Sequence, residues 1–164
     1  MAVQIARAAE TFSEWSEVLR VLQDAFAFME GRIDPPSSVH GLTSTSIATK
    51  SREETLFLAT DEDELLGCVF ARRLDDAVYV SKLAVRPGRQ AKGIGRRLME
   101  AVEEHARHLG VGNLELDTRI ELTENHAAFA AMGFIKTVEH AHEGYERPTF
   151  ITMRKRLTMP SPGH

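Results

Sequence analysis

The sequence predicts a single α+β domain in which one mixed, mostly antiparallel sheet carries helices on both faces. A chain of 164 residues is long enough to bury one sizeable core. Segments with the two-residue alternation of strands and segments with helical spacing follow one another in the order β-α-α-β-β-β-α-β-α-β-β. One sheet covered on both sides would bury the apolar stripes of all these segments.

The first fifty residues contain an edge strand, a helix, a loop and a weak short helix. Thr11 to Glu14 has the form of a capping box, and apolar residues at helical spacing follow it. Pro35 and Pro36 predict a rigid, non-helical loop. In order, these elements are expected at residues 3–7, 15–26, 31–43 and 44–50.

Three strands then form an antiparallel meander. Acidic turns at Asp61–Asp63 and Asp75–Asp76 separate runs of alternating or continuous apolar residues. The strands are expected at residues 55–60, 65–73 and 77–85. Within the third strand, simple alternation places Tyr79, Ser81 and Leu83 on one face.

The second half begins with an amphipathic helix over residues 93–108, whose inward positions include Ile94, Leu98 and Val102. Gly110 ends this helix. A strand, a short helix and two final strands are expected at residues 114–120, 124–132, 134–140 and 150–157. The domain thus covers residues 1–157, and residues 158–164 form a flexible tail.

Charge and composition exclude several functional classes. The net charge is −4, but the segment from Lys82 to Arg97 holds six basic residues and no acid. A local basic segment in an acidic chain indicates an anion site and argues against nucleic-acid binding. The chain lacks a long apolar run and a signal-peptide core, so we expect no membrane association and a cytoplasmic location. Cys68 is single, which excludes an internal disulfide, and it is expected in the core.

Residues Gln90 to Gly95 form a glycine-containing turn between a strand and a helix. Two glycines let the backbone approach a ligand closely, and the first helical amides point outward at the positive end of the helix dipole. Arg96 and Arg97 lie in the first helical turn, where a cation is unfavourable by roughly 0.3–1 kcal/mol unless an anion is present. The turn therefore predicts a polyphosphate site.

Two common phosphate loops do not fit this turn. The dinucleotide fingerprint requires a third glycine where this chain has Leu98. The P-loop requires Lys followed by Ser or Thr, and Ile94 and Gly95 stand there instead. The polyphosphate is therefore neither a dinucleotide nor a nucleotide held in a P-loop.

The turn matches the pattern Gln/Arg-x-x-Gly-x-Gly/Ala of the Gcn5-related N-acetyltransferases (GNAT) at residues 90–95. Residues 83–87 resemble the fourth strand of that family, and residues 124–134 resemble its motif B. Three motifs in the right order, together with the order of elements, make the chain resemble this family over residues 3–157.

The resemblance implies acetyl-CoA as co-substrate and a sheet whose fourth and fifth strands splay apart. The pantetheine arm would pair with the open strand edge, and the pyrophosphate would lie on the turn and the helix start. The residues implied in this binding are Leu83, Ala84, Val85, Gln90, Ala91, Lys92, Gly93, Ile94, Gly95, Arg96, Asn125 and Phe129.

The chain departs from the family at its usual general acid, a tyrosine that is replaced here by Phe129. Tyr145, in the loop between the last two strands, is the first catalytic candidate to replace it, although it could be an ordinary surface residue. Tyr79 occupies the place of a catalytic glutamate found in some relatives and is the second candidate. A strand aromatic is the alternative interpretation, because a neutral tyrosine is a poor base.

The loop between the first two helices would shape the acceptor pocket in this fold. Glu30, Arg32 and His40 are the substrate-binding candidates there, and an ordinary connector between helices is the alternative interpretation of this loop. Histidine pairs at 105 and 108 and at 140 and 142 lack an obvious third ligand, so we expect no metal site.

These observations predict an enzyme that transfers acetyl from acetyl-CoA to a primary amine, with a small molecule as the favoured acceptor. Attack would be direct, in a ternary complex, with the backbone amide of Leu83 stabilising the oxyanion. The alternatives are acetylation of a protein N-terminus or lysine, and a non-catalytic acyl-CoA-binding module. A homodimer is possible, since dimers are frequent in the family that the chain resembles.

Overall fold

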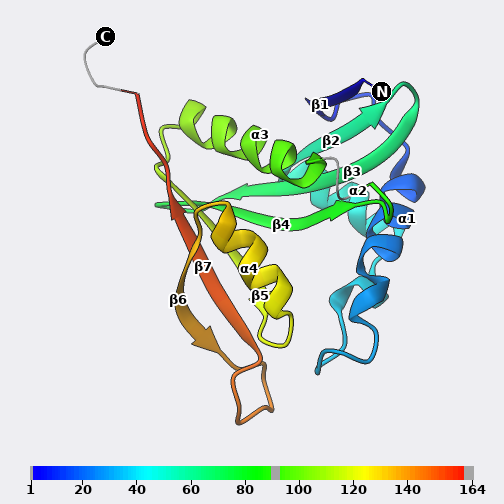
Figure 1. Cartoon of the computed structure of the whole chain (residues 1–164). Helices are drawn as coiled ribbons and strands as arrows, with labels where there is room; N and C mark the ends of the chain where they lie inside the picture. Colours follow the sequence, from blue (N-terminus) through cyan, green and yellow to red (C-terminus); the bar gives the residue numbers. More distant parts are fainter. Residues whose placement is uncertain (1, 90–92, 161–164) are drawn as a thin grey trace.

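The computed structural model describes residues 2–89 and 93–160, and its centre is a seven-stranded sheet with helices on both faces (Figure 1). The strand order is β1-β2-β3-β4-β5-β7-β6. The strands are β1 (Val3–Arg7), β2 (Thr55–Asp61), β3 (Glu64–Arg73), β4 (Val78–Val85), β5 (Asn113–Arg119), β6 (Ile135–His140) and β7 (Phe150–Arg156). The helices are α1 (Trp15–Phe26), η1 (Ala27–Met29), η2 (Ser38–Gly41), α2 (Ser44–Glu53), α3 (Ile94–His108) and α4 (Thr123–Ala131).

The splay predicted for the fourth and fifth strands is confirmed by their register. All neighbouring strands pair antiparallel except β4 and β5, which are parallel. Their ladder contains only the pairs Val78 with Leu114 and Tyr79 with Glu115. Beyond these pairs the two strands separate, and β5, β7 and β6 turn away from β1 to β4 (Figure 1). The sheet therefore opens in its middle.

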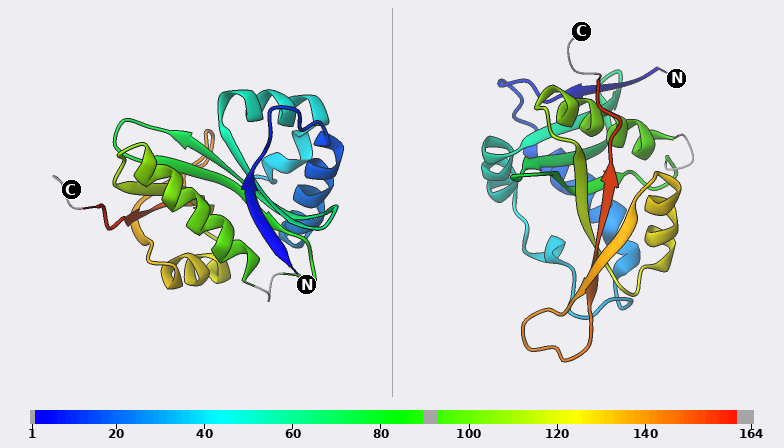
Figure 2. Two further views of the ribbon diagram at one scale, coloured as in Figure 1. Left: turned by 90° about the horizontal axis from the view of Figure 1, so that it is seen from above. Right: turned by 90° about the vertical axis from the view of Figure 1, so that its left-hand side faces the viewer.

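Helices cover the two faces of the sheet with separate apolar clusters (Figure 2). Val18, Leu22 and Ile47 of α1 and α2 pack against Phe70 of β3 on one face. On the other face, α3 buries its inward positions, Leu98 among them, against β2 to β5. This is the two-sided arrangement that the sequence predicts, and it confirms the α+β class.

A β-bulge in β4 reverses the direction of its side chains. Cys68 pairs with Ala84 and Phe70 pairs with Ser81, so two residues of β4, Lys82 and Leu83, lie opposite one residue of β3. Lys82 takes a left-handed backbone conformation with φ 56°. The extra residue re-aims the strand at the point where it leaves β5.

The bulge makes one expectation wrong. Val78 and Val80 point into the α3 cluster, and Leu83 also packs against that cluster. Tyr79 and Ser81 alternate with the two valines, so they face the other way from Leu83. Strict alternation had placed Tyr79, Ser81 and Leu83 on one face, and it fails because the inserted residue shifts the period.

The predicted capping box at Thr11 to Glu14 is also wrong. Glu14 is the N-cap of α1 and its side chain makes no capping hydrogen bond. Phe12 instead packs edge-on against Trp15, with ring centroids 4.9 Å apart. A capping box is present at α2, where Thr43 and Ser46 bond each other's backbone amides, and this helix continues to Glu53.

We expect Gly67→Ala to destabilise the fold by about 1–3 kcal/mol, because overpacking displaces a well-packed core. A Cβ at Gly67 would lie 2.7 Å from the Ala84 carbonyl oxygen and 3.2 Å from Leu98 Cδ1. Urea unfolding measures the change. Gly41→Ala is the matched control, since no heavy atom lies within 4 Å of its added Cβ. Equal stabilities of the two variants would contradict the close approach of β3, β4 and α3.

Candidate functional site

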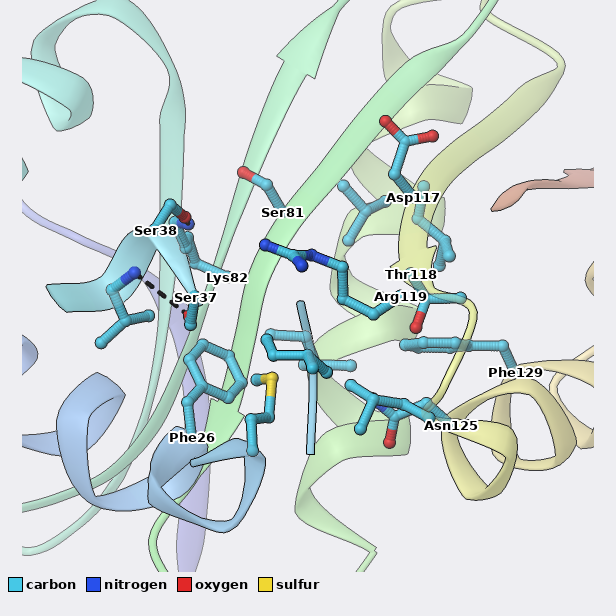
Figure 3. Close-up of a pocket in the computed structure, with 17 residues that line it drawn as sticks. Phe26, Ser37, Ser38, Ser81, Lys82, Asp117, Thr118, Arg119, Asn125 and Phe129 are labelled. Atoms are coloured by element: carbon cyan, nitrogen blue, oxygen red, sulfur yellow. Dashed lines mark hydrogen bonds between the residues drawn. The ribbon is translucent and has the colours of Figure 1, made fainter. Parts of the chain in front are cut away.

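Two adjoining cavities lie where β4 and β5 separate. The β5 cavity has a volume of about 190 Å³ and is shown in Figure 3. It is bordered by Phe26, Met29, Ile33, Ser37, Ser38, Val39, Val80, Ser81, Lys82, Leu83, Leu116, Asp117, Thr118, Arg119, Leu122, Asn125 and Phe129. The α3 cavity, of about 360 Å³, is bordered by Ala25, Phe26, Phe28, Leu83, Ala84, Val85, Gly93, Gly95, Arg96, Asn125, Ala128, Phe129 and Met132.

The two cavities meet at Phe26, Leu83, Asn125 and Phe129, which border both. Leu83 comes from β4, whereas Asn125 and Phe129 lie one helical turn apart on α4. The two cavities therefore lie side by side, with these four side chains at their common border.

The start of α3 borders the α3 cavity and has the character of an anion site. Gly93 is the N-cap of α3 in a left-handed conformation with φ 71°. The first turn of α3 holds no acidic residue, and Arg96 is exposed there. Helix amides and an arginine together favour a phosphate.

Of the predicted anion-binding residues, Gln90, Ala91 and Lys92 lie outside the described residues. The Ile94 side chain is buried in the core, so only its backbone could take part. Gly93, Gly95 and Arg96 border the α3 cavity. The structure therefore brings part of the motif to the cavity.

The other basic residues that the structure describes in the 82–97 segment have structural partners. Arg86 contacts Glu17 and Asp24 and donates to the Leu65 carbonyl. Arg97 donates to the Val3 carbonyl at 3.0 Å, and Arg89 contacts Glu64 at 3.3 Å. Arg96 is thus the basic side chain that the described part of the segment places at the α3 cavity. The charge of Arg86, Arg89 and Arg97 suggested that they also belong to the anion site, but these side chains contact acids and backbone carbonyls of the protein instead.

Lys82 and Arg119 bring positive charge to the β5 cavity from opposite strands (Figure 3). Lys82 Nζ donates to Ser38 Oγ at 2.9 Å. Burial lowers the pKa of Lys82, with a further lowering from Lys50. Arg119 donates from Nη1 to the Pro35 carbonyl at 2.5 Å and from Nη2 to the Pro36 carbonyl at 3.1 Å. Burial lowers the pKa of Arg119. Both cations are partly removed from water.

Asp117 is the acidic side chain at the edge of the β5 cavity, and its oxygens are already engaged. Oδ2 accepts a hydrogen bond from the Tyr79 hydroxyl at 2.9 Å, and Oδ1 accepts one from Thr152 Oγ1 at 2.6 Å. The pKa of Tyr79 is raised chiefly by burial and to a smaller extent by the charge of Asp117. Tyr79 is therefore a protonated donor, and it borders neither cavity. This geometry disfavours Tyr79 as a general base.

Tyr145, the other catalytic candidate, also borders neither cavity. Its hydroxyl donates to Asp34 Oδ1 at 2.6 Å, and that hydrogen bond raises its pKa. Arg147 contacts the same carboxylate at 3.3 Å. The two residues connect the loop between β6 and β7 to the loop after α1.

The substrate-binding candidates of the loop after α1 make contacts outside the β5 cavity. Arg32 donates to both oxygens of Glu124 at 2.8 Å, and Glu30 contacts His40 at 3.2 Å. The same loop borders the cavity through other residues, namely Met29, Ile33, Ser37, Ser38 and Val39. Sequence reasoning favoured the charged residues of this loop. The sequence does mark the residues that border the cavity in one way, because Met29, Ile33 and Val39 are isolated apolar residues in a polar connector.

Cys68 is buried beneath the bulge and is not placed to carry an acyl group. Its Sγ lies 3.7 Å from the Lys82 carbonyl oxygen, and burial raises the pKa of the thiol to about 12. A thiol in this state is a weak nucleophile. Over residues 2–89 and 93–160, no group of three metal-ligating side chains occurs and no helix is long and apolar enough to cross a membrane.

The sheet opens between β4 and β5, with a helix start at one cavity and the loop after α1 at the border of the other. The family model described as the acetyltransferase (GNAT) family matches residues 15–134. The chain belongs to this family of N-acetyltransferases.

Individual relatives agree with this class. The chain is 30% identical over 125 residues to an aminoglycoside N(6')-acetyltransferase type 1 of Stenotrophomonas maltophilia, covering 70% of this chain and 82% of the relative. Its fold is similar to that of the ribosomal-protein-S18-alanine N-acetyltransferase of Escherichia coli, with TM-score 0.73, 17% identity and 99% of each chain covered. It is also similar to the PaiA N-acetyltransferase of Thermoplasma acidophilum in complex with coenzyme A, with TM-score 0.75, 13% identity, and 95% and 99% covered.

We expect Tyr145→Phe to raise KM for the acceptor by less than about fivefold and to leave kcat nearly unchanged, because it removes one exposed contact that holds a loop. Steady-state kinetics over a pH series test this. If Tyr145 were the general acid, its removal would lower kcat by roughly 10²–10⁴-fold. Arg147→Gln is the matched control, since it weakens the same loop contact through Asp34.

Proposed function

We propose that this acetyltransferase moves an acetyl group from acetyl-CoA to a primary amine of a small molecule, with both substrates bound at once. The observation that carries the proposal is the junction of the two cavities at Leu83, Asn125 and Phe129. Acetyl-CoA occupies the α3 cavity and the amine occupies the β5 cavity. The thioester and the amine then meet at the junction.

The α3 cavity fits the chemistry of CoA. The edge of β4 that has left β5 offers backbone groups at Leu83, Ala84 and Val85 for the amide-containing pantetheine, in the manner of an added strand. The start of α3, with Gly93, Gly95 and Arg96, suits the pyrophosphate. The similar fold that holds coenzyme A supports this assignment.

Transfer follows direct attack by the neutral amine on the thioester carbonyl. The new C–N bond forms as the C–S bond breaks, and the amine nitrogen loses its proton to water. The amide of Leu83 is the donor that we assign to the developing oxyanion. Phe129 has no proton to give, but a thiol with a pKa of about 8.5 leaves acceptably as thiolate and takes its proton from water. No acyl-cysteine intermediate is required, in accord with the burial of Cys68.

The small volume of the β5 cavity favours a small acceptor over a protein. A volume of about 190 Å³ is below the 300–1,000 Å³ typical of drug-sized ligands. The loop after α1 borders the cavity and is fastened across the sheet opening by Arg119 and by the contacts of Asp34. A peptide would need an open groove at that place. The name of the relative that is 30% identical also describes a small-molecule acetyltransferase.

A screen of acceptors tests the proposal. CoA release is measured with amino acids, polyamines, aminoglycosides, peptides and intact proteins, and products are identified by mass. We expect an N-acetylated small amine and initial-rate lines that intersect, as a ternary complex requires. Acetylation of peptides or proteins alone would exclude the small-molecule acceptor, and parallel lines would exclude direct attack.

We expect Arg96→Gln to weaken binding of CoA by roughly 3–10-fold, because one phosphate contact at an exposed site is lost. The difference from the wild type should shrink at high salt, where exposed charges are screened. Calorimetric titration with CoA at two salt concentrations provides the measurement. Arg20→Gln, which changes an exposed arginine on α1, is the control and should bind CoA like the wild type. Equal affinity of the two variants would remove Arg96 from the pyrophosphate site.

A further inference from the structure

We propose that the acceptor of this enzyme is an amino acid or a related amine that carries a carboxylate and an apolar body, and that Lys82 and Arg119 bind the carboxylate in the β5 cavity. This inference rests on the proposed function and specifies the substrate class of its acceptor site. It distinguishes this chain from the aminoglycoside acetyltransferase that it is similar to, because aminoglycosides are polycations.

The first argument is the pair of cations at one small cavity. Lys82 of β4 and Arg119 of β5 both border it, and Arg119 extends across the opening toward β4 (Figure 3). Each has lost hydration, and Arg119 lowers the pKa of Lys82, so the two charges repel one another. Such a pair is unfavourable unless an anion lies between the charges.

The second argument is that Asp117 is the acid among the lining residues of the cavity, whereas Asp34, Glu54 and Glu121 lie near the two cations without bordering it. One carboxylate oxygen each of Glu54 and Glu121 is buried without a hydrogen-bond partner among the described residues. Asp117 accepts hydrogen bonds from Tyr79 and Thr152. Glu54 pairs with Lys50 at 2.8 Å. On the Arg119 side, Asp34 and Glu121 lie near the guanidinium but pair with Arg147 at 3.3 and 3.9 Å. The described residues thus leave the cavity itself with more positive than negative charge.

The third argument is the supply of hydrogen-bond donors. The Ser81 hydroxyl oxygen is buried and has no hydrogen-bond partner among the described residues. Arg119 donates once from each of Nη1 and Nη2 to the loop carbonyls, and a guanidinium carries five N–H donors in all, so Arg119 has further donors to offer a ligand. A carboxylate accepts several hydrogen bonds and suits both a guanidinium and an ammonium group.

The remaining wall of the cavity defines the body of the acceptor. Phe26, Met29, Ile33 and Val39 present apolar side chains from α1 and the loop that follows it. These would pack against an apolar side chain. An additional ammonium group on the ligand would face Lys82 and Arg119 and be repelled.

The experiment compares each acid with its amide, which is similar in size and lacks the negative charge. The acceptors are leucine, methionine and phenylalanine and their amides, and spermidine and kanamycin represent polycations. We expect kcat/KM, calculated for the neutral form of each amine because the amide lowers the pKa of the amino group, to be at least about tenfold higher for the acids, the effect of one charged hydrogen-bonded contact. In parallel, N-acetyl-leucine and N-acetyl-leucinamide are titrated into the CoA-loaded protein by calorimetry, with the same preference expected.

Variants assign the preference to the two cations. Arg119→Gln and Lys82→Gln should each remove most of the preference for acid over amide, and Arg119→Lys should keep part of it because it retains the charge. Arg147→Gln is the matched control, because Arg147 fastens the same loop through Asp34 without bordering the cavity. It should change acid and amide by equal factors. Circular dichroism verifies that each variant is folded.

The outcomes separate the two proposals. If amides or polycations are acetylated as well as the acids, or if Arg119→Gln affects acid and amide equally as Arg147→Gln does, the carboxylate site is excluded while the acetyltransferase proposal stands. If no amine is acetylated, the proposed function fails. The calorimetric titration still tests the carboxylate site in that case. Tighter binding of N-acetyl-leucine than of N-acetyl-leucinamide supports the site, and equal binding overturns it.

Discussion

The parallel ladder between β4 and β5 ends after two residue pairs, and the candidate site depends on that early end. The two strands are held together at one end by their pairing, and they are separate at the other end, where Lys82 adds a residue to β4. The opening exposes a strand edge, admits the side chain of Arg119, and leaves room for two cavities. Closing it would remove both cavities and the junction between them.

The two halves of the site are built by different means. The α3 cavity depends on backbone features, a strand edge and a helix start, which recognise amide and phosphate groups without much help from side chains. The β5 cavity depends on side chains, with two cations, a buried hydroxyl and an apolar wall. A common cofactor needs only the first kind of recognition. Selection among amines needs the second.

The sequence predicts the fold well because alternation and helical spacing are local signals. The strands and helices lie within a few residues of their expected places, and the glycines at 93 and 95 do border a cavity. The bulge at Lys82 was missed, since nothing local marks the inserted residue. The contact of Tyr145 with Asp34 spans 111 positions, so only the folded chain brings the two side chains together. The same reason explains why Met29, Ile33 and Val39, rather than Glu30, Arg32 and His40, face the β5 cavity.

The loop after α1 is held chiefly by polar contacts at the surface, among them Arg32 with Glu124 and Arg147 with Asp34. Exposed ion pairs contribute roughly 0–1 kcal/mol each. Substitutions in this loop can therefore reshape the acceptor pocket with little loss of stability, because the apolar clusters on either face of the sheet hold the domain together. An enzyme built this way can acquire a new substrate through drift in one loop while its cofactor site stays intact.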